Sequence, residues 1–225
     1  MATATVAKNG KTADTDVDIR SFVIPQIAQQ ECILEIKGIT SLIMHHFSKK
    51  AQKQMRDSQQ KVARSQKESR NPDEEWKAAC YVVPGQEDAE DWKPGKYYWP
   101  ATAFKLAFLY GVGQMQDKAK LPKNLATGWL FVHDDPILDF ESVSLKEDTG
   151  RIGMGTTTLI YRPYFNEWSV DLHVDFNSNT ISLEQVVSLM DLGGYAGGIG
   201  DWRPSAPKNK GGSFGRFRVT GVRTL

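Results

Sequence analysis

The segment from Glu167 to Phe176 constrains the fold more than any other, because apolar and polar side chains alternate along it without interruption. An extended chain places successive side chains on opposite faces, so one face of this segment is apolar and the other polar. The apolar side chains are those of Trp168, Val170, Leu172, Val174 and Phe176. This pattern predicts a half-buried strand of an antiparallel sheet, with one face covered by the core.

Two helices and three further strands are predicted around this strand. A helix is expected from Pro100 to Gly111, with proline in its first turn and glycine at its end, and another over Leu183–Leu192, capped by Ser182 and ended by Gly193. Strands are expected at Glu31–Ile39, Gly128–His133 and Phe214–Val222, and a loop or strand edge at 151–158. This order predicts the α+β class: a ferredoxin-like (RRM-like) core with an antiparallel sheet, two helices and a basic insertion.

Charge is strongly segregated along the chain, although the 28 basic and 27 acidic residues leave a net charge of only +1. Residues 49–70 carry a net +6, residues 71–95 a net −5, and residues 201–225 a net +5. The first segment is rich in helix-forming residues, but its large apolar side chains are only Met55 and Val62. It is therefore expected to be either a solvated, projecting helix or a loop that orders on a partner.

Composition excludes several classes of protein. The 225 residues are 40% hydrophobic, which is typical of a globular protein. Residues 1–20 are expected to form a disordered arm, followed by a single domain over 21–225 with an insertion at 48–96. Two cysteines are too few for a disulfide scaffold or a structural zinc site. The sequence shows no signal peptide and no membrane-spanning apolar run, so a cytoplasmic protein with no membrane partner and no cofactor is expected.

The segment Gly193–Val219 holds eight glycines and three basic residues within its loop. Glycines clustered between a helix and a strand allow the backbone to approach a ligand or another backbone closely. Exposed backbone N–H groups in such loops bind phosphate. A surface hairpin whose glycines satisfy turn geometry alone explains the composition equally well.

Three segments, in this order, resemble motifs of the RAMP superfamily, the repeat-associated RNA-binding proteins of CRISPR systems. The family's glycine-rich motif is resembled by GIG, a basic spacer and GSFGRF. Its first strand and the turn after it are resembled by ILEIKGITSLIMHHFS. The start of its first helix is resembled by WPATAFKLAFLYG, with Lys105 at the motif lysine. The likeness spans about residues 31–219. It is nearest to the subunits that form the backbone of CRISPR effectors along guide RNA, or to a stand-alone, phage-encoded relative.

The resemblance implies a protein that binds single-stranded RNA or DNA on and beside the ferredoxin-like sheet. It also implies self-assembly into a homo-oligomer or helical filament along the strand, and possible other subunits of a ribonucleoprotein in a prokaryotic or phage-infected cell. The acidic segment is expected to meet the basic surface of a neighbouring copy. Tyr97, Tyr98, Trp99 and Trp202 are candidates for base stacking. The expected nucleic-acid-binding residues are His45, His46, Lys49, Lys50, Lys53, Arg56, Lys105, Gly198, Gly200, Trp202, Arg203, Lys208, Lys210, Gly212, Phe214 and Arg216.

Two other functions stay open. A metal-independent endoribonuclease would use His45 or His46 as the general base, since the pKa of imidazole lies near neutrality. A structural assembly protein would have kept the fold and lost nucleic-acid binding. No catalytic residue and no metal site is predicted: His133, Asp134, Asp135 and Asp139 suggest a metal site only weakly, because Asp-Pro is a common turn.

Overall fold

A four-stranded antiparallel sheet is the larger of the two sheets in the described part of the chain. The computed structural model describes residues 26–47, 49–61, 69–115, 126–152, 156–207 and 211–225. The expected N-terminal arm therefore lies outside the described residues. β1 (Gln29–Gly38) pairs with β6 (Ser169–Asn177) on one side and with β7 (Phe217–Thr224) on the other. β3 (Leu130–Val132) pairs with β6, so the order across the sheet is β3-β6-β1-β7.

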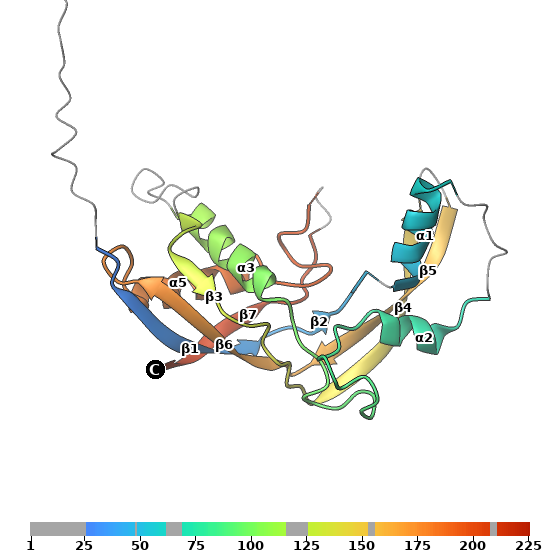
Figure 1. The fold of residues 1–225 in the computed structure, drawn as a ribbon, viewed down its shortest axis with the longest axis horizontal. Helices are drawn as coiled ribbons and strands as arrows, with labels where there is room; N and C mark the ends of the chain where they lie inside the picture. The colour runs from blue at the N-terminus through green and yellow to red at the C-terminus, as the bar shows by residue number, and fades with distance from the viewer. Residues whose placement is uncertain (1–25, 48, 62–68, 116–125, 153–155, 208–210) are drawn as a thin grey trace, which may run out of the picture.

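Two helices lie on one face of this sheet (Figure 1). α3 (Ala101–Gln114) connects β1 to β3, and α5 (Leu183–Ala196) connects β6 to β7. The chain order β-α-β-β-α-β with this strand order is the ferredoxin-like arrangement, so the predicted α+β fold class is confirmed. No helix in the described part of the chain is long and apolar enough to cross a bilayer.

The core lies between the two helices and the sheet, and the alternation of β6 produces it. All five apolar side chains from Trp168 to Phe176 are buried, as predicted. β1 adds Cys32, Leu34 and Ile36 from the neighbouring strand. Because every second side chain points to the helices, the intervening side chains of both strands form an open face on the other side of the sheet.

Both helices run past the glycines that were predicted to end them. α3 continues through Gly111 to Gln114, and α5 continues through Gly193 to Ala196. The two glycines lie where the helices cross: a Cβ on Gly111 would approach the Leu189 carbonyl oxygen to 2.2 Å, and one on Gly193 would approach the Ala107 carbonyl oxygen to 1.9 Å. Close backbone packing, rather than helix termination, therefore explains these glycines.

A second, three-stranded sheet extends from the core, and most of it was not predicted. β4 (Ser142–Ile152) and β5 (Thr156–Asn166) form a long hairpin, and β2 (Leu42–Ile43) pairs with β5. Of the loop or strand edge expected at 151–158, residues 151–152 and 156–158 are paired strand residues of this hairpin. The hairpin escaped prediction because β4 carries charged residues without strict alternation, which removes the usual strand signal.

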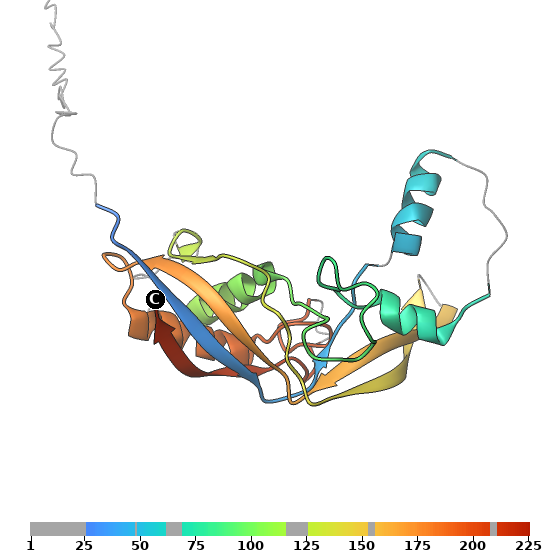
Figure 2. The ribbon, with the colours of Figure 1, turned by 60° about the horizontal axis from the view of Figure 1, so that its bottom comes forward.

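The basic and acidic segments lie between β2 and α3. α1 (Lys49–Gln59) occupies the first 11 residues of the basic segment, which was expected to be a helix or a loop, and α2 (Pro72–Ala78) begins after the capping residue Asn71. Trp76 fastens α2 to the hairpin, because its ring packs against Tyr161 at 5.4 Å and its Nε1 donates to the Lys146 carbonyl at 3.0 Å. Figure 2 shows α1 and α2 at the hairpin end of the molecule, away from α3 and α5.

Candidate nucleic-acid interface

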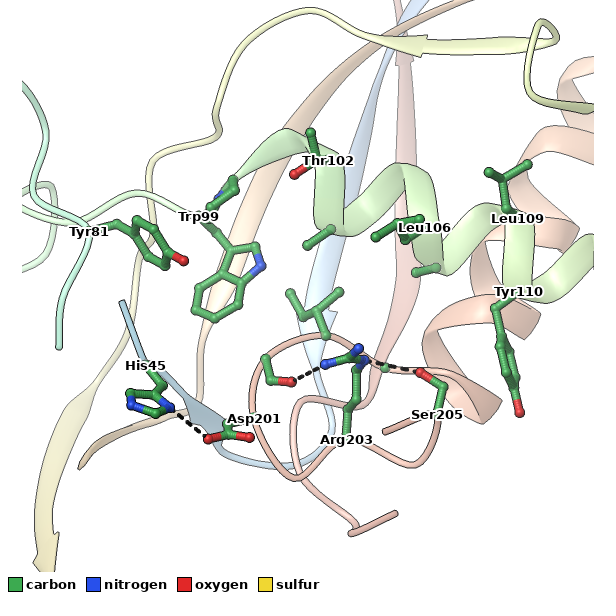
Figure 3. A pocket seen from close by; sticks show the side chains of 16 residues that line it. His45, Tyr81, Trp99, Thr102, Leu106, Leu109, Tyr110, Asp201, Arg203 and Ser205 are labelled. Atoms are coloured by element: carbon green, nitrogen blue, oxygen red, sulfur yellow. Dashed lines mark hydrogen bonds and ion pairs between the residues drawn. The ribbon is translucent and has the colours of Figure 1, made fainter. Parts of the chain in front are cut away.

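A pocket of about 530 Å³ lies between α3 and the glycine-rich loop 197–215, beside the end of β2 (Figure 3). Its volume is in the range of small-molecule and cofactor sites, which is about 300–1,000 Å³. Its polar lining comes mainly from the loop, and its apolar lining from α3 and the residues before it. The lining residues are His45, Tyr81, Trp99, Pro100, Thr102, Ala103, Leu106, Ala107, Leu109, Tyr110, Gly198, Ile199, Gly200, Asp201, Arg203 and Ser205.

A chain of ion pairs forms one rim of the pocket. Asp201 Oδ2 lies 3.1 Å from His45 Nδ1 and 3.1 Å from Arg162 Nη2. The hydrogen bond from His45, together with the charge of the Arg162 guanidinium, holds the pKa of Asp201 below its ordinary value. Arg162 is only 7% exposed and lies 4.0 Å from Asp148. Asp201 is therefore a fixed carboxylate, held by a hydrogen bond with His45 and by an ion pair with Arg162.

Arg203 offers a positive charge to the same pocket. Its Nη1 donates to the Gly200 carbonyl at 2.8 Å, and its Nε donates to Ser205 Oγ at 3.2 Å. Within the ranges that the structure describes, no carboxylate pairs with this guanidinium. Figure 3 shows the side chain rising from the loop toward α3. Its charge therefore remains available to a ligand in the pocket.

The indole of Trp99 adds a hydrogen-bond donor that has no acceptor. Trp99 is 4% exposed, and its Nε1 is one of two buried side-chain polar atoms without a partner among the described residues. An unsatisfied buried donor costs about 1–3 kcal/mol, so it marks a position where a ligand acceptor would be stabilised. Tyr81 packs against this indole at 5.8 Å, and burial raises the pKa of its hydroxyl. That hydroxyl therefore stays protonated.

The glycines of the loop serve backbone packing more than an open anion site. Gly200 (φ 81°) and Gly215 (φ 64°) adopt the left-handed conformation, and a Cβ on Gly215 would approach the Ile199 carbonyl oxygen to 1.7 Å. Many loop N–H groups donate to backbone carbonyls, for example Ile199 to Gly215, Asp201 to Ile43 and Gly215 to Ser41. Side chains, rather than those N–H groups, are thus the candidates for phosphate contact.

Four of the predicted site residues line this pocket together, namely His45, Gly198, Gly200 and Arg203. His46 lies next to it, with its ring 4.7 Å from Tyr81 in an edge-to-face contact. The exposed cations of α1 stand apart on the hairpin side (Figure 1). Of these, Lys50, Lys53 and Arg56 are exposed, and Lys49 is the first residue of the helix.

Lys105 lies elsewhere, although its motif position predicted a nucleic-acid contact. Its Nζ donates to the carbonyls of Thr127 and Leu130, and it lies 4.8 Å from the centre of the Phe131 ring. Burial lowers the pKa of this ammonium. The structure thus places Lys105 at the β3 edge of the sheet, where it ties α3 to β3.

The remaining predicted residues are spread around the loop. Arg216 donates from Nε to the Tyr195 carbonyl at 2.9 Å, with its guanidinium 4.0 Å from the Tyr195 ring centre. Phe214 packs against Tyr164 at 5.3 Å. Gly212 is packed against the Trp202 carbonyl, and Lys208 and Lys210 lie outside the described residues. Among the four stacking candidates, Tyr97 and Trp99 are core residues, Tyr98 is half-buried, and Trp202 is 43% exposed.

Sequence reasoning missed several residues of the site, above all Asp201 and Arg162. Asp201 is the one acid in a basic segment, a signal that pointed toward an ion pair but not to its partner. Arg162 lies in the hairpin that was not predicted. The residues that weakly suggested a metal site have other contacts. Asp135 Oδ1 accepts from the Ala101 N–H at 2.7 Å and so caps α3, and the His133 ring stacks on His173.

Comparisons with known proteins do not assign this chain to a family. No family model matches the chain, and no curated protein matches it. The crystal structure of Cmr6 from Pyrococcus furiosus is similar at 10% identity with a TM-score of 0.37, over 86% of this chain and 100% of that one. A TM-score this low does not establish a shared fold. The likeness to RAMP proteins therefore stays a prediction.

Proposed function

We propose that this chain binds single-stranded nucleic acid in the pocket between α3 and the loop 197–215. The observation that carries the proposal is the pairing, in one pocket, of the unpartnered Trp99 N–H with the guanidinium of Arg203, which has no carboxylate partner among the described residues. A nucleotide offers both complements: hydrogen-bond acceptors on the base and negative charge on the phosphate.

The base would lie beside Trp99, at the Tyr81 end of the pocket. Trp99 Nε1 would donate to a base acceptor, and the half-buried rings of Tyr81 and Tyr110 lie at opposite ends of the lining (Figure 3). Stacking of a base on an aromatic side chain contributes about 1–3 kcal/mol and tolerates any base. Unstacked bases are presented mainly by single-stranded segments, so the proposed partner is single-stranded.

The phosphate would lie at Arg203. A guanidinium presents a fork of donors that suits phosphate oxygens, and such contacts give affinity without reading sequence. Asp201 is the nearby carboxylate that would oppose a phosphate, but Arg162 forms an ion pair with it and His45 forms a hydrogen bond with it. The guanidinium of Arg203, which has no carboxylate partner among the described residues, is therefore left to contact a phosphate.

The cations of α1 would form a second anchor for the strand. Lys53 and Arg56 are exposed on α1, which like α3 lies on the upper side of the sheets in Figure 1. Self-association along the strand, with other subunits as further partners, belongs to the same proposal. Several acids expected to meet a neighbouring copy instead pair within the chain, such as Asp91 with Lys77 and Lys96.

The proposal is tested by replacing Trp99 with phenylalanine, which removes the donor and keeps an aromatic ring. Anisotropy of labelled single-stranded RNA and DNA of one sequence should show affinity reduced about 3- to 10-fold, the worth of one hydrogen bond. The free variant loses a buried unsatisfied donor but also leaves a cavity, so its melting temperature is compared with that of a second Trp→Phe variant in the core. Trp129→Phe, in the core outside the pocket, is the matched control.

Equal affinities for wild type, Trp99→Phe and Trp129→Phe would contradict the proposal. Absence of any oligonucleotide binding, with assembly in a preparation free of nucleic acid, would instead support the structural assembly protein. RNA is the partner that the RAMP resemblance favours, and the RNA–DNA comparison in the same assay decides between the two.

A metal-independent endoribonuclease is the second candidate, because a carboxylate orients the imidazole of His45, as is typical of a general base. Its Nδ1 is paired with Asp201 at 3.1 Å, which orients the ring and leaves Nε2 on the other side. His46 packs against Tyr81 instead, so His45 is the favoured base. Cleavage of labelled RNA in EDTA should disappear in His45→Ala and persist in His46→Ala. Undiminished cleavage by His45→Ala, or none by wild type, would exclude this function.

A further inference from the structure

A second cluster of chemically reactive side chains lies on the open face of the sheet, opposite α3 and α5. His133 follows β3 and is paired across the strands with His173 of β6, since its N–H donates to the His173 carbonyl at 3.1 Å. The two imidazole rings are stacked, with centroids 4.2 Å apart and planes inclined by 16°. This stack is separate from the pocket, whose lining contains neither histidine.

A carboxylate lies at each of the two rings. Glu31 Oε2 of β1 lies 3.2 Å from His173 Nε2, and Asp175 Oδ1 of β6 lies 3.2 Å from His133 Nε2. The amide of Gln29 donates to Asp175 at 3.1 Å and to Glu31 at 3.4 Å. It thereby orients both carboxylates toward the histidines, as outer-shell partners of metal ligands do.

We propose that these side chains form a site for a divalent transition-metal ion, with Zn²⁺ as the best-suited ion. One ligand atom from each of Glu31, His133 and His173 lies within 4.8 Å of the other two. Zinc binds imidazole nitrogen and carboxylate oxygen at about 2.0–2.2 Å in a tetrahedral arrangement, so its ligand atoms lie about 3.3–3.6 Å apart. The rings of His133 and His173 would therefore turn out of their stack to direct a nitrogen at the ion, and Asp175 is within reach as a fourth ligand.

The charges around the cluster favour a cation. Glu31 and Asp175 have the histidines as their ion-pair partners, whereas Arg223 pairs with Glu35 and Asp171 farther along the same face. Lys105, at the β3 edge, donates to backbone carbonyls, and its ammonium is also close enough to Asp175 to interact with that carboxylate electrostatically. Two carboxylates and two neutral imidazoles carry a charge of −2, which a divalent ion neutralises.

The ion would join three strands at the weakest edge of the sheet. β3 is only three residues long and pairs with β6 alone. Ligands on β1, after β3 and on β6 would cross-link this edge to the centre of the sheet. Because the ion would bind the folded chain and not the unfolded one, it should raise the melting temperature.

The test is titration of the EDTA-treated and dialysed full chain with Zn²⁺, followed by calorimetry and thermal melting. One ion per chain should bind and raise the melting temperature, and Co²⁺ should give the visible absorption bands of a site with imidazole ligands. His133→Asn and His173→Asn should each weaken Zn²⁺ binding at least about tenfold, the least that loss of even an outer-shell partner costs. Glu31→Gln, which preserves size on an exposed strand position, should weaken it as well.

The matched controls are His45→Asn and His46→Asn, since the chain has four histidines in all. Both should bind Zn²⁺ as the wild type does. Lack of Zn²⁺ binding by the wild type would overturn the proposal. So would binding that survives the His133 and His173 changes together, or that is lost in the His45 or His46 variants. Melting of each variant without metal identifies any that fails to fold, in which case Glu31→Gln decides.

Discussion

The two sides of the ferredoxin-like sheet carry opposite chemistry. The helix side ends in a pocket with Arg203 and an unpartnered indole N–H, whereas the open side carries four carboxylates on its two central strands. These are Glu31, Glu35, Asp171 and Asp175. In RRM domains the open face carries aromatic side chains on which bases stack. An RRM-like topology thus does not fix which side binds nucleic acid, because the surface side chains decide it.

The largest expected effect concerns the crossing of α3 and α5. This crossing builds the helix side of the sheet and does not touch the open face. Gly193→Ala would place a Cβ 1.9 Å from the Ala107 carbonyl oxygen, a backbone atom that cannot rotate away. We expect a loss of about 2 kcal/mol or more in the free energy of unfolding, measured by urea denaturation. Ser188→Ala, at an exposed position of the same helix, should change it by less than about 0.5 kcal/mol. Equal stability of the two variants would contradict the packing described.

A smaller effect separates Asp201, on the pocket side, from Asp171, on the open face. Asp201→Asn should destabilise the protein by about 1–3 kcal/mol at pH 7, because a charge-assisted hydrogen bond from His45 and the charge of Arg162 are lost. The folded-state pKa of Asp201 is lowered, so this stabilisation is complete above the ordinary aspartate pKa and is lost as the pH falls through the folded value. The difference between wild type and variant should therefore close in acid.

The control for this prediction is Asp171→Asn, whose ion pair with Arg223 is exposed. Exposed pairs contribute about 0–1 kcal/mol, so stability at pH 7 should scarcely change. A gap for Asp201→Asn that stays constant from pH 7 down to about pH 3 would show that its carboxylate is not the group responsible.

The smallest expected effect concerns Lys105. Lys105→Met should change oligonucleotide affinity by less than about twofold, because its ammonium binds two backbone carbonyls, while loss of these bonds should lower stability by about 1 kcal/mol. Lys53→Met, at an exposed position of α1, should weaken binding and lower the salt slope by about one. If Lys105→Met lowers oligonucleotide affinity more than Lys53→Met does, the β3 edge belongs to the binding surface after all.

The fold could be predicted from sequence where burial imposes a local period. The alternation of β6 and the capping of α5 by Ser182 both report local geometry, and together they indicated the ferredoxin-like order. The β4–β5 hairpin was missed because its arms are partly exposed and charged. Gly111 and Gly193 were misread because a glycine at a helix crossing and a glycine at a helix end look alike in sequence.

The candidate site was predictable only in part, since its contacts join distant segments. Charge counts identified Arg203 and the cations of α1, but nothing local indicates that Asp201 pairs with His45 and with Arg162. The His133–His173 stack depends on the pairing of β3 with β6, which sequence periodicity does not specify. The role of a charged residue therefore depends on its ion-pair or hydrogen-bond partner, which the sequence alone does not identify.

The central claim, that nucleic acid binds on the pocket side and not on the open face, is tested most directly by two matched arginine changes. Arg203→Ala and Arg223→Ala each remove one guanidinium, the first from the pocket and the second from ion pairs with Glu35 and Asp171. Affinity for a single-stranded oligonucleotide should be measured from low to high salt. We expect Arg203→Ala to weaken binding about tenfold and to lower the salt slope by about one, with Arg223→Ala unchanged within about twofold. Equal loss in both variants, or loss only in Arg223→Ala, would contradict the account.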